Sequence, residues 1–159
     1  MREKILQVLE KDARVDTEEL AIRIGEDPDA VAAEITAMEK ENIISGYNTM
    51  INWEKAGVEK VTAMIEVSVT PQRGMGFDAI ARKIYQYPEV DSVSLISGSC
   101  DLMVTIEGTT LKQVASFVSE KLSLMDSVIQ TKTNFILKRY KDHGIVMAET
   151  KKDERIPMS

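Results

Sequence analysis

The stretch Ile96-Ser-Gly-Ser-Cys-Asp-Leu-Met-Val-Thr-Ile-Glu-Gly108 decides the fold of the larger part of the chain. Apolar residues alternate with polar ones before it and in its second half, which is the period of half-buried strands. Gly98 to Asp101 are turn residues, so a β-hairpin is predicted. At its tip a glycine, a hydroxyl and a carboxylate could together face a small polar ligand. The simpler interpretation is a tight turn in which Asp101 supports its own backbone.

In the segments around this hairpin, the spacing of apolar residues is alternately that of a strand and that of a helix. Residues 61–70 alternate as a strand, 77–87 carry an inward helical stripe, and the hairpin follows over 90–108. A second helix opens at Thr110 with a capping box, and 128–140 form the last strand. This order predicts a ferredoxin-like βαββαβ unit of the α+β class, a four-stranded antiparallel sheet with both helices on one face.

The other face of this sheet has no cover from its own chain. Depending on register, four apolar side chains are expected there: Met64, Ile96, Met103 and Ile136. Exposed apolar area is better buried against a second copy, so we expect a homodimer that forms through the sheets. An extended segment at 47–53 is expected to take part in the same interface.

The first 46 residues predict three short amphipathic helices. The second begins after Asp16, whose carboxylate can accept from first-turn amides while Glu19 reaches back. The third begins after Asp27 and runs to about Asn42. The turn around Gly25 between these two helices gives a helix-turn-helix pattern. A small helical bundle used for protein contacts is the alternative.

Residues 43–47 predict two short strands around a Ser-Gly turn, as in the wing of a winged helix-turn-helix domain. The expected organisation is a winged helix-turn-helix domain at 1–46, a linker with an extended strand at 47–60, the βαββαβ domain at 61–142 and a polar tail at 143–159.

Charge is unevenly distributed along the chain. The net charge is −6, and residues 1–50 hold six Lys or Arg against twelve Asp or Glu, so this third carries all of it. Such a balance opposes binding to a polyanion.

Other chemistry finds little support in the sequence. Cys100 is the only cysteine, and the chain has no apolar run of membrane-spanning length, so we expect a cytosolic protein without a membrane partner. His143 is the only histidine and lies in a polar segment, where solvation is its ordinary state. We therefore expect no metal, no cofactor and no catalytic residue.

Three local motifs, in order, resemble the leucine-responsive regulator and asparagine regulator (Lrp/AsnC) family of transcription factors over about residues 2–142. They are Asp12-Ala13-Arg14 ahead of Glu19-Leu20-Ala21, the run Met38-Glu-Lys-Glu-Asn-Ile-Ile-Ser-Gly-Tyr47, and the Gly98–Asp101 hairpin. The resemblance implies a DNA-binding regulator with a ligand-sensing (RAM-type) C-terminal domain. It also implies a homodimer, in many members a tetramer or octamer, that binds double-stranded operator DNA and senses an amino acid.

The resemblance also implies site residues. The effector would lie near the hairpin, with Gly98, Ser99 and Asp101 forming one wall and Thr131 and Thr133 as further candidates. Asp101 would pair with an α-amino group, and amides near Gly98 would receive the carboxylate. The DNA-contacting positions of the third helix would be Asp29, Ala33, Glu34, Thr36, Ala37 and Lys40.

The third helix departs from the family pattern because its contact positions lack the arginine common there. Glu34 could accept from a cytosine amino group. The remaining candidates for phosphate contacts are Arg2, Lys4, Arg14, Arg23 and Lys40. Two alternatives stay open: a regulatory subunit that senses a ligand or pairs with a more basic paralogue, and a tetrapyrrole decarboxylase related to this family. The enzyme would need histidines and arginines around its substrate.

Overall fold

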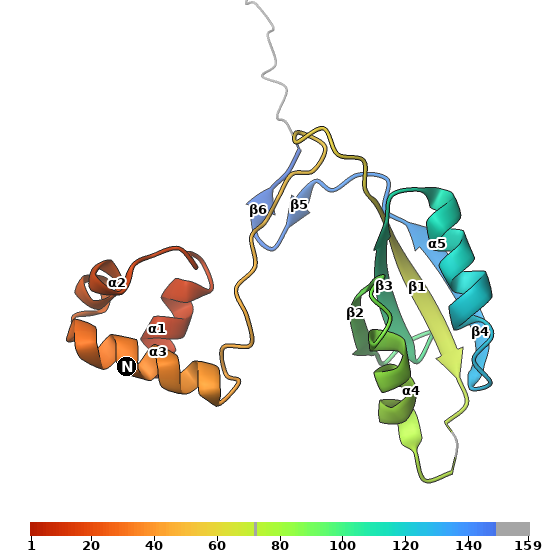
Figure 1. Ribbon diagram of the computed structural model, residues 1–159, viewed down its shortest axis with the longest axis horizontal. Coiled ribbons are helices and arrows are strands. Elements are labelled where there is room, and N and C mark those ends of the chain that lie inside the picture. The colour runs from red at the N-terminus through yellow and green to blue at the C-terminus, as the bar shows by residue number, and fades with distance from the viewer. Residues whose placement is uncertain (72, 149–159) are drawn as a thin grey trace, which may run out of the picture. The chain divides into compact units, whose positions relative to one another are not determined.

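The computed structural model describes residues 1–71 and 73–148 (Figure 1). The chain divides between Ile51 and Asn52 into two compact units, and this boundary falls inside the segment predicted as the linker. We describe each unit separately.

The first unit contains the three predicted helices, α1 (Arg2–Leu9), α2 (Thr17–Ile24) and α3 (Pro28–Lys40). Their apolar stripes meet in one small core, because each helix turns one apolar side inward. The fully buried side chains are Ile5, Leu20, Ala21, Val31 and Met38.

Both predicted N-caps of this unit form. Asp16 Oδ1 accepts a hydrogen bond from the Glu19 amide at 2.7 Å, and Asp27 Oδ2 accepts one from the Ala30 amide at 3.0 Å. The reciprocal contact predicted for Glu19 does not form, because its carboxylate pairs with Arg23 one turn later. Gly25 ends α2 with a positive φ of 73°, a conformation that glycine adopts without strain.

The predicted wing strands at 43–47 are wrong for this structure, which assigns no strand between α3 and residue 61. The Ile43 amide donates to the Met38 carbonyl and the Asn42 amide to the Glu39 carbonyl, and Asn42 adopts a positive φ of 56°. The Ile44 amide also donates to the Met38 carbonyl. This is the Schellman arrangement, so the first two residues of the expected wing close the third helix instead of pairing. The extended strand predicted in the linker is likewise not assigned.

The second unit has the predicted order of elements. They are β1 (Val61–Val69), α4 (Gly76–Tyr85), β2 (Val90–Leu95), β3 (Leu102–Gly108), α5 (Leu111–Phe117) and β4 (Val128–Phe135). The strands form one antiparallel sheet in the order β2-β3-β1-β4, and Figure 1 shows α4 and α5 on the same face of it. This confirms the α+β class and the βαββαβ topology.

The core lies between this sheet and the two helices. Ile65 of β1 pairs with Val104 of β3, and Val67 pairs with Leu102, so one face of adjacent strands is entirely apolar. Ile84 of α4 packs against that face. After Phe117 the helix continues as a π-helical turn, η1 (Val118–Leu122).

The end of the unit differs from the prediction. β4 ends at Phe135, five residues before the expected end of the last strand. A two-stranded hairpin, β5 (Lys141–Asp142) and β6 (Ile145–Val146), follows, and positive φ angles at His143 and Gly144 form its turn. The polar tail was expected to begin here, but its charged run at 151–155 lies outside the described residues.

The open face of the sheet is less apolar than predicted. Met64 is 38% exposed there, and Met103 is half-buried opposite Glu66. The other side chains that the register places on this face are mostly polar: Thr62, Ser68, Ser92, Ser94, Thr105, Gln130, Lys132 and Asn134. Ile96 and Ile136 are half-buried just beyond β2 and β4.

We predict that Asp27→Ala lowers the free energy of unfolding by about 1 kcal/mol, because the Ala30 amide at the start of α3 loses its acceptor. Urea denaturation followed by circular dichroism measures this change. Asp29→Ala, two residues later on the same helix, is the matched control and removes no capping hydrogen bond. Equal losses from the two variants would contradict the capping role of Asp27.

Candidate functional site

The predicted DNA-contacting residues of α3 are not equally available. Asp29, Ala33, Thr36 and Lys40 are exposed, whereas Glu34 and Ala37 are half-buried. The Thr36 hydroxyl donates to the Ala32 carbonyl at 3.0 Å within the helix. The exposed surface of α3 therefore has small side chains along its middle, with Asp29 at its start and Glu39 and Lys40 at its end.

Glu34 is engaged by Arg2, at the start of α1. Arg2 Nε donates to Glu34 Oε2 at 2.6 Å, and its two terminal nitrogens donate to the Glu41 carboxylate at 2.7 and 3.0 Å. We call these three residues the Arg2 clamp. The hydrogen bonds from Arg2 hold the pKa of Glu41 below its usual range and raise that of Arg2 itself. Arg2 and Glu34, both predicted to contact DNA, thus bind each other within the helical unit.

The other residues predicted to contact phosphates are of two kinds, those paired with carboxylates and those without an ion pair. Arg23 pairs with Glu19 and lies 3.8 Å from Asp12. Within the described part of the chain, Lys4, Arg14 and Lys40 make no ion pair. These three are the phosphate-contact candidates whose charge is not already matched inside the unit.

Asp101, at the tip of the predicted hairpin, forms hydrogen bonds to the end of β1. Its Oδ2 accepts from the Val69 amide at 2.9 Å, its amide donates to the Val67 carbonyl at 3.1 Å, and its carbonyl accepts from Ile96. The Val69 amide lies at a bulge in the pairing of β1 with β4. Asp101 therefore supports a neighbouring strand as well as its own turn, and its Oδ1 accepts no hydrogen bond from a described residue.

The other hairpin residues leave space at the tip. Gly98 and Ser99 are exposed, and a Cβ added at Gly98 would meet no atom within 4 Å. Gly98 does not have a positive φ, so the turn itself does not require glycine here. Cys100 is buried, and its thiol donates to the Leu102 carbonyl at 3.4 Å.

Thr131 and Thr133 are at the same sheet but not beside the hairpin. The register pairs Thr131 with Val67 and Thr133 with Ile65, which places both threonines on the helix-covered face, half-buried. β1 lies between β4 and β3, so roughly 10 Å separates Thr131 from the start of β3. A single subunit does not bring the five predicted effector residues into one recess.

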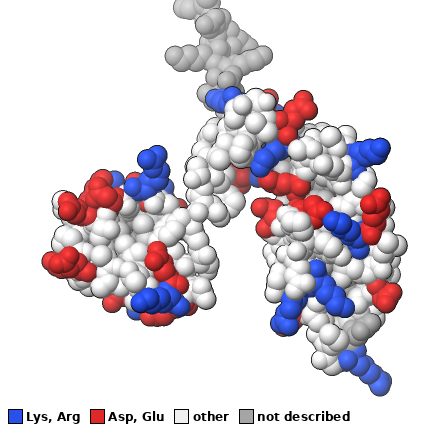
Figure 2. Space-filling model, viewed as in Figure 1, with Lys and Arg blue, Asp and Glu red and all other residues white. Residues whose placement is uncertain are grey.

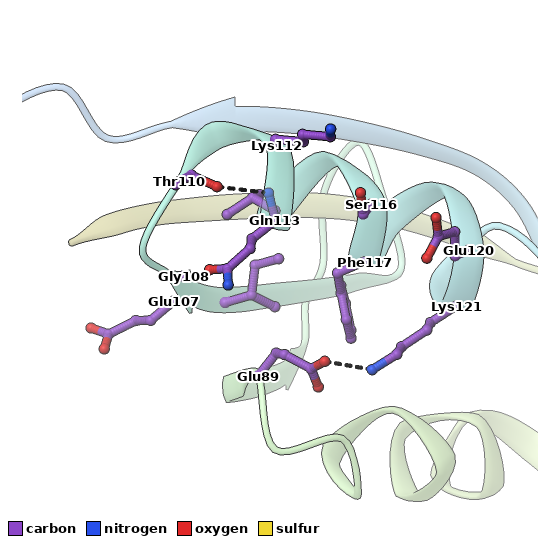
Figure 3. Close-up of a pocket in the computed structure, with 12 residues that line it drawn as sticks. Glu89, Glu107, Gly108, Thr110, Lys112, Gln113, Ser116, Phe117, Glu120 and Lys121 are labelled. Atoms are coloured by element: carbon purple, nitrogen blue, oxygen red, sulfur yellow. Dashed lines mark hydrogen bonds and ion pairs between the residues drawn. The ribbon is translucent and has the colours of Figure 1, made fainter. Parts of the chain in front are cut away.

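A pocket of about 400 Å³, which the sequence does not predict, lies beside α5. Figure 3 shows Lys121 of η1 reaching toward Glu89 just before β2, and the two side chains form an ion pair. The Lys121 ammonium also lies 5.3 and 5.7 Å from the ring centres of Tyr87 and Phe117. The hydrogen bond from Lys121 lowers the pKa of Glu89. No sequence pattern links these residues, because 32 positions separate the two charges.

Metal and membrane chemistry find no site in the described ranges 1–71 and 73–148. No group of three or more His, Cys, Asp or Glu side chains there could hold a metal ion. No helix in those ranges is long and apolar enough to cross a membrane.

A helix-turn-helix unit followed by a βαββαβ unit defines a class of two-part regulators, and comparisons with known proteins agree. The Lrp/AsnC ligand binding domain matches residues 62–146. The uncharacterized HTH-type transcriptional regulator YugG of Bacillus subtilis is 48% identical over 98% of this chain and 95% of its own. The chain belongs to the Lrp/AsnC family of transcriptional regulators.

More distant relatives carry more specific names. The proline dehydrogenase transcriptional activator of Rhodobacter capsulatus is 30% identical over 80% of this chain and 82% of its own. The crystal structure of the transcriptional regulator NMB0573 with L-Met from Neisseria meningitidis has a TM-score of 0.70 and 25% identity, covering 87% and 89% of the two chains. These names describe regulators, which points away from an enzyme.

We predict that Arg2→Gln moves the pKa of Glu41 back up to its usual range. Because the pKa is lowered in the folded protein, the ion pair contributes stability above the usual pKa of Glu41 and loses it as the pH falls through the lowered value. The variant should therefore lose less stability than the wild type on acidification. Carbon-detected NMR titration of the Glu41 carboxyl group measures the shift. Lys4→Gln, which breaks no ion pair, should leave that titration unchanged.

Proposed function

We propose that the protein is a DNA-binding transcriptional regulator that acts as a dimer or larger assembly and responds to a small effector, an amino acid. The observation that supports this most is the likeness to an HTH-type regulator over 98% of the chain, together with a first unit that has helix-turn-helix order. The regulated genes are expected to serve amino-acid metabolism, since one relative is named a proline dehydrogenase transcriptional activator and another regulator was crystallised with L-Met.

Figure 2 shows Asp and Glu side chains over several parts of the visible face of the first unit, and this charge would limit its affinity for DNA. Arg2 and Arg23 are matched by carboxylates within the unit, which leaves few cations to displace counterions from the phosphates. Each unit would then bind DNA weakly, and joining two or more units in one assembly would supply the affinity by raising the effective concentration of the second contact.

A second candidate function follows from the same charge. A subunit with an acidic helix-turn-helix unit could sense a ligand and join a more basic paralogue without binding DNA itself. The pairing of Arg2 and Arg23 with carboxylates of the same unit favours this candidate. A DNA-binding assay on the purified chain distinguishes a DNA-binding regulator from a sensing subunit.

We expect an electrophoretic shift with the upstream region of its own gene at low salt and micromolar protein. Lys40→Gln should weaken binding and reduce the salt dependence by about one unit of slope, because it removes one phosphate contact. Lys83→Gln, at an exposed position of α4 in the second unit, is the matched control and should bind as the wild type does. The absence of a complex at micromolar protein would contradict DNA binding and leave the sensing subunit.

We expect one or more of the twenty amino acids to raise the thermal midpoint of the protein. A ligand at about one hundred times its dissociation constant adds about 2.7 kcal/mol of stability. Asp101→Asn should reduce the shift, since it removes the charge that would pair with the α-amino group. This variant keeps an oxygen for the Val69 amide, whereas Asp101→Ala would also cost about 1–3 kcal/mol of stability through an unpaired buried amide.

The hairpin variant needs a control of its own. Ser97→Ala changes an exposed hydroxyl in the same loop and should retain both the midpoint and the ligand shift. If Asp101→Asn kept the full shift, the effector site would not lie at this hairpin.

A further inference from the structure

The pocket beside α5 has an apolar floor and a charged rim. Ile106 of β3 and Val114 and Phe117 of α5 are buried at its base. Charged and polar side chains line the rest, among them the carboxylates of Glu89 and Glu120 and the ammonium groups of Lys112 and Lys121. Glu107 is also at the rim, where its carboxylate pairs with Lys60 at 3.1 Å. An apolar floor below a few polar groups is the usual character of a small-molecule site.

Glu89 is the polar group with unused bonding capacity. Its Oε1 binds Lys121, whereas its Oε2 is shielded from solvent and has no hydrogen-bond partner in the described ranges. Its own backbone amide favours the ionised form but does not reach Oε2 in hydrogen-bond geometry. A shielded carboxylate oxygen without a donor is costly, so a donor that entered the pocket would be bound favourably.

The carboxylate is held in place by its surroundings. Lys121 lies over two aromatic rings, which meet edge to face at 5.5 Å between their centres, and its helical turn is of the rare π type, which recurs at functional sites. The last torsion of a glutamate side chain has a broad energy well. Rotation about this torsion moves both oxygens together, so a ligand ammonium would share the carboxylate with Lys121.

Gln113 supplies a second polar contact on the same side of α5, as Figure 3 shows. Its Oε1 accepts from the amide and hydroxyl of Thr109, both at 2.8 Å. These bonds fix the side-chain amide and leave its nitrogen without an acceptor in the described part of the chain. A ligand oxygen could receive that N–H.

We propose that this pocket binds a small organic ammonium compound, with its ammonium group on Glu89 and its apolar body over Ile106, Val114 and Phe117. α-Amino acids belong to this class when their carboxylate accepts from Gln113. The site lies within one subunit, at the opposite end of β3 from the hairpin tip, and goes beyond the proposed function because it needs neither DNA nor a second copy.

Three related probes test the chemistry: 3-methylbutylamine, L-leucine and 4-methylpentanoate, which share one apolar body. Saturation-transfer NMR on the full-length protein should show saturable binding of the amine and of L-leucine, and none of 4-methylpentanoate. Glu89→Gln should weaken amine binding at least tenfold. Glu41→Gln makes the same chemical change in the Arg2 clamp and should leave amine binding unchanged.

Two further variants keep the test decisive. Gly108→Ala would place a Cβ 3.3 Å from both Gln113 Oε1 and Val114 Cγ2, so it should narrow the pocket and weaken amine binding while Glu89 stays intact. Asp101→Asn should not affect the amine, which separates this site from the hairpin. Binding of 4-methylpentanoate as strong as that of the amine, no saturable binding of any probe, or unchanged amine binding in a folded Glu89→Gln protein would overturn the proposal.

Discussion

The second unit depends on the burial of alternate side chains along β1. Ala63, Ile65 and Val67 are fully buried, and a slip of one residue would move all three to the open face. Asp101 fixes one end of this register, because its carboxylate accepts from the Val69 amide where a bulge interrupts the pairing with β4. The position of the hairpin tip is therefore a consequence of how β1 is held between its two neighbours.

The first unit distributes its charge by pairing within itself. Twelve carboxylates in the first third of the chain would repel one another around a small core, and the Arg2 clamp brings the start of α1 against the later part of α3. Exposed pairs of this kind contribute little stability individually, so the five buried side chains carry the fold. A guanidinium held by two carboxylates would be less available to a phosphate. Affinity for DNA would then depend on how many units act together.

Local periodicity predicted the helices, strands and caps because those features depend on neighbours in the sequence. The wing was wrong because the amides of Ile43 and Ile44 had a nearer acceptor in the Met38 carbonyl, a choice that hydrophobic pattern does not report. Pairs of residues far apart in the sequence could not be predicted, because periodicity and turn patterns report only on near neighbours. Arg2 meets Glu34, and Glu89 meets Lys121, across 32 residues in each case, so neither the clamp nor the pocket has a sequence signal. The predicted effector and DNA contacts stay predictions. The structure adds that Asp101 accepts a hydrogen bond from the Val69 amide and that Glu34 accepts one from Arg2.

The two proposed ligand positions share one strand. β3 begins beside Asp101 and ends at Gly108 on the wall of the pocket, a span of roughly 20 Å along seven residues. Leu102, Val104 and Ile106 of this strand are buried in the common core. A close-packed core transmits a small displacement with little compression. Both positions therefore border one buried strand, which lies between β2 and β1 in the sheet.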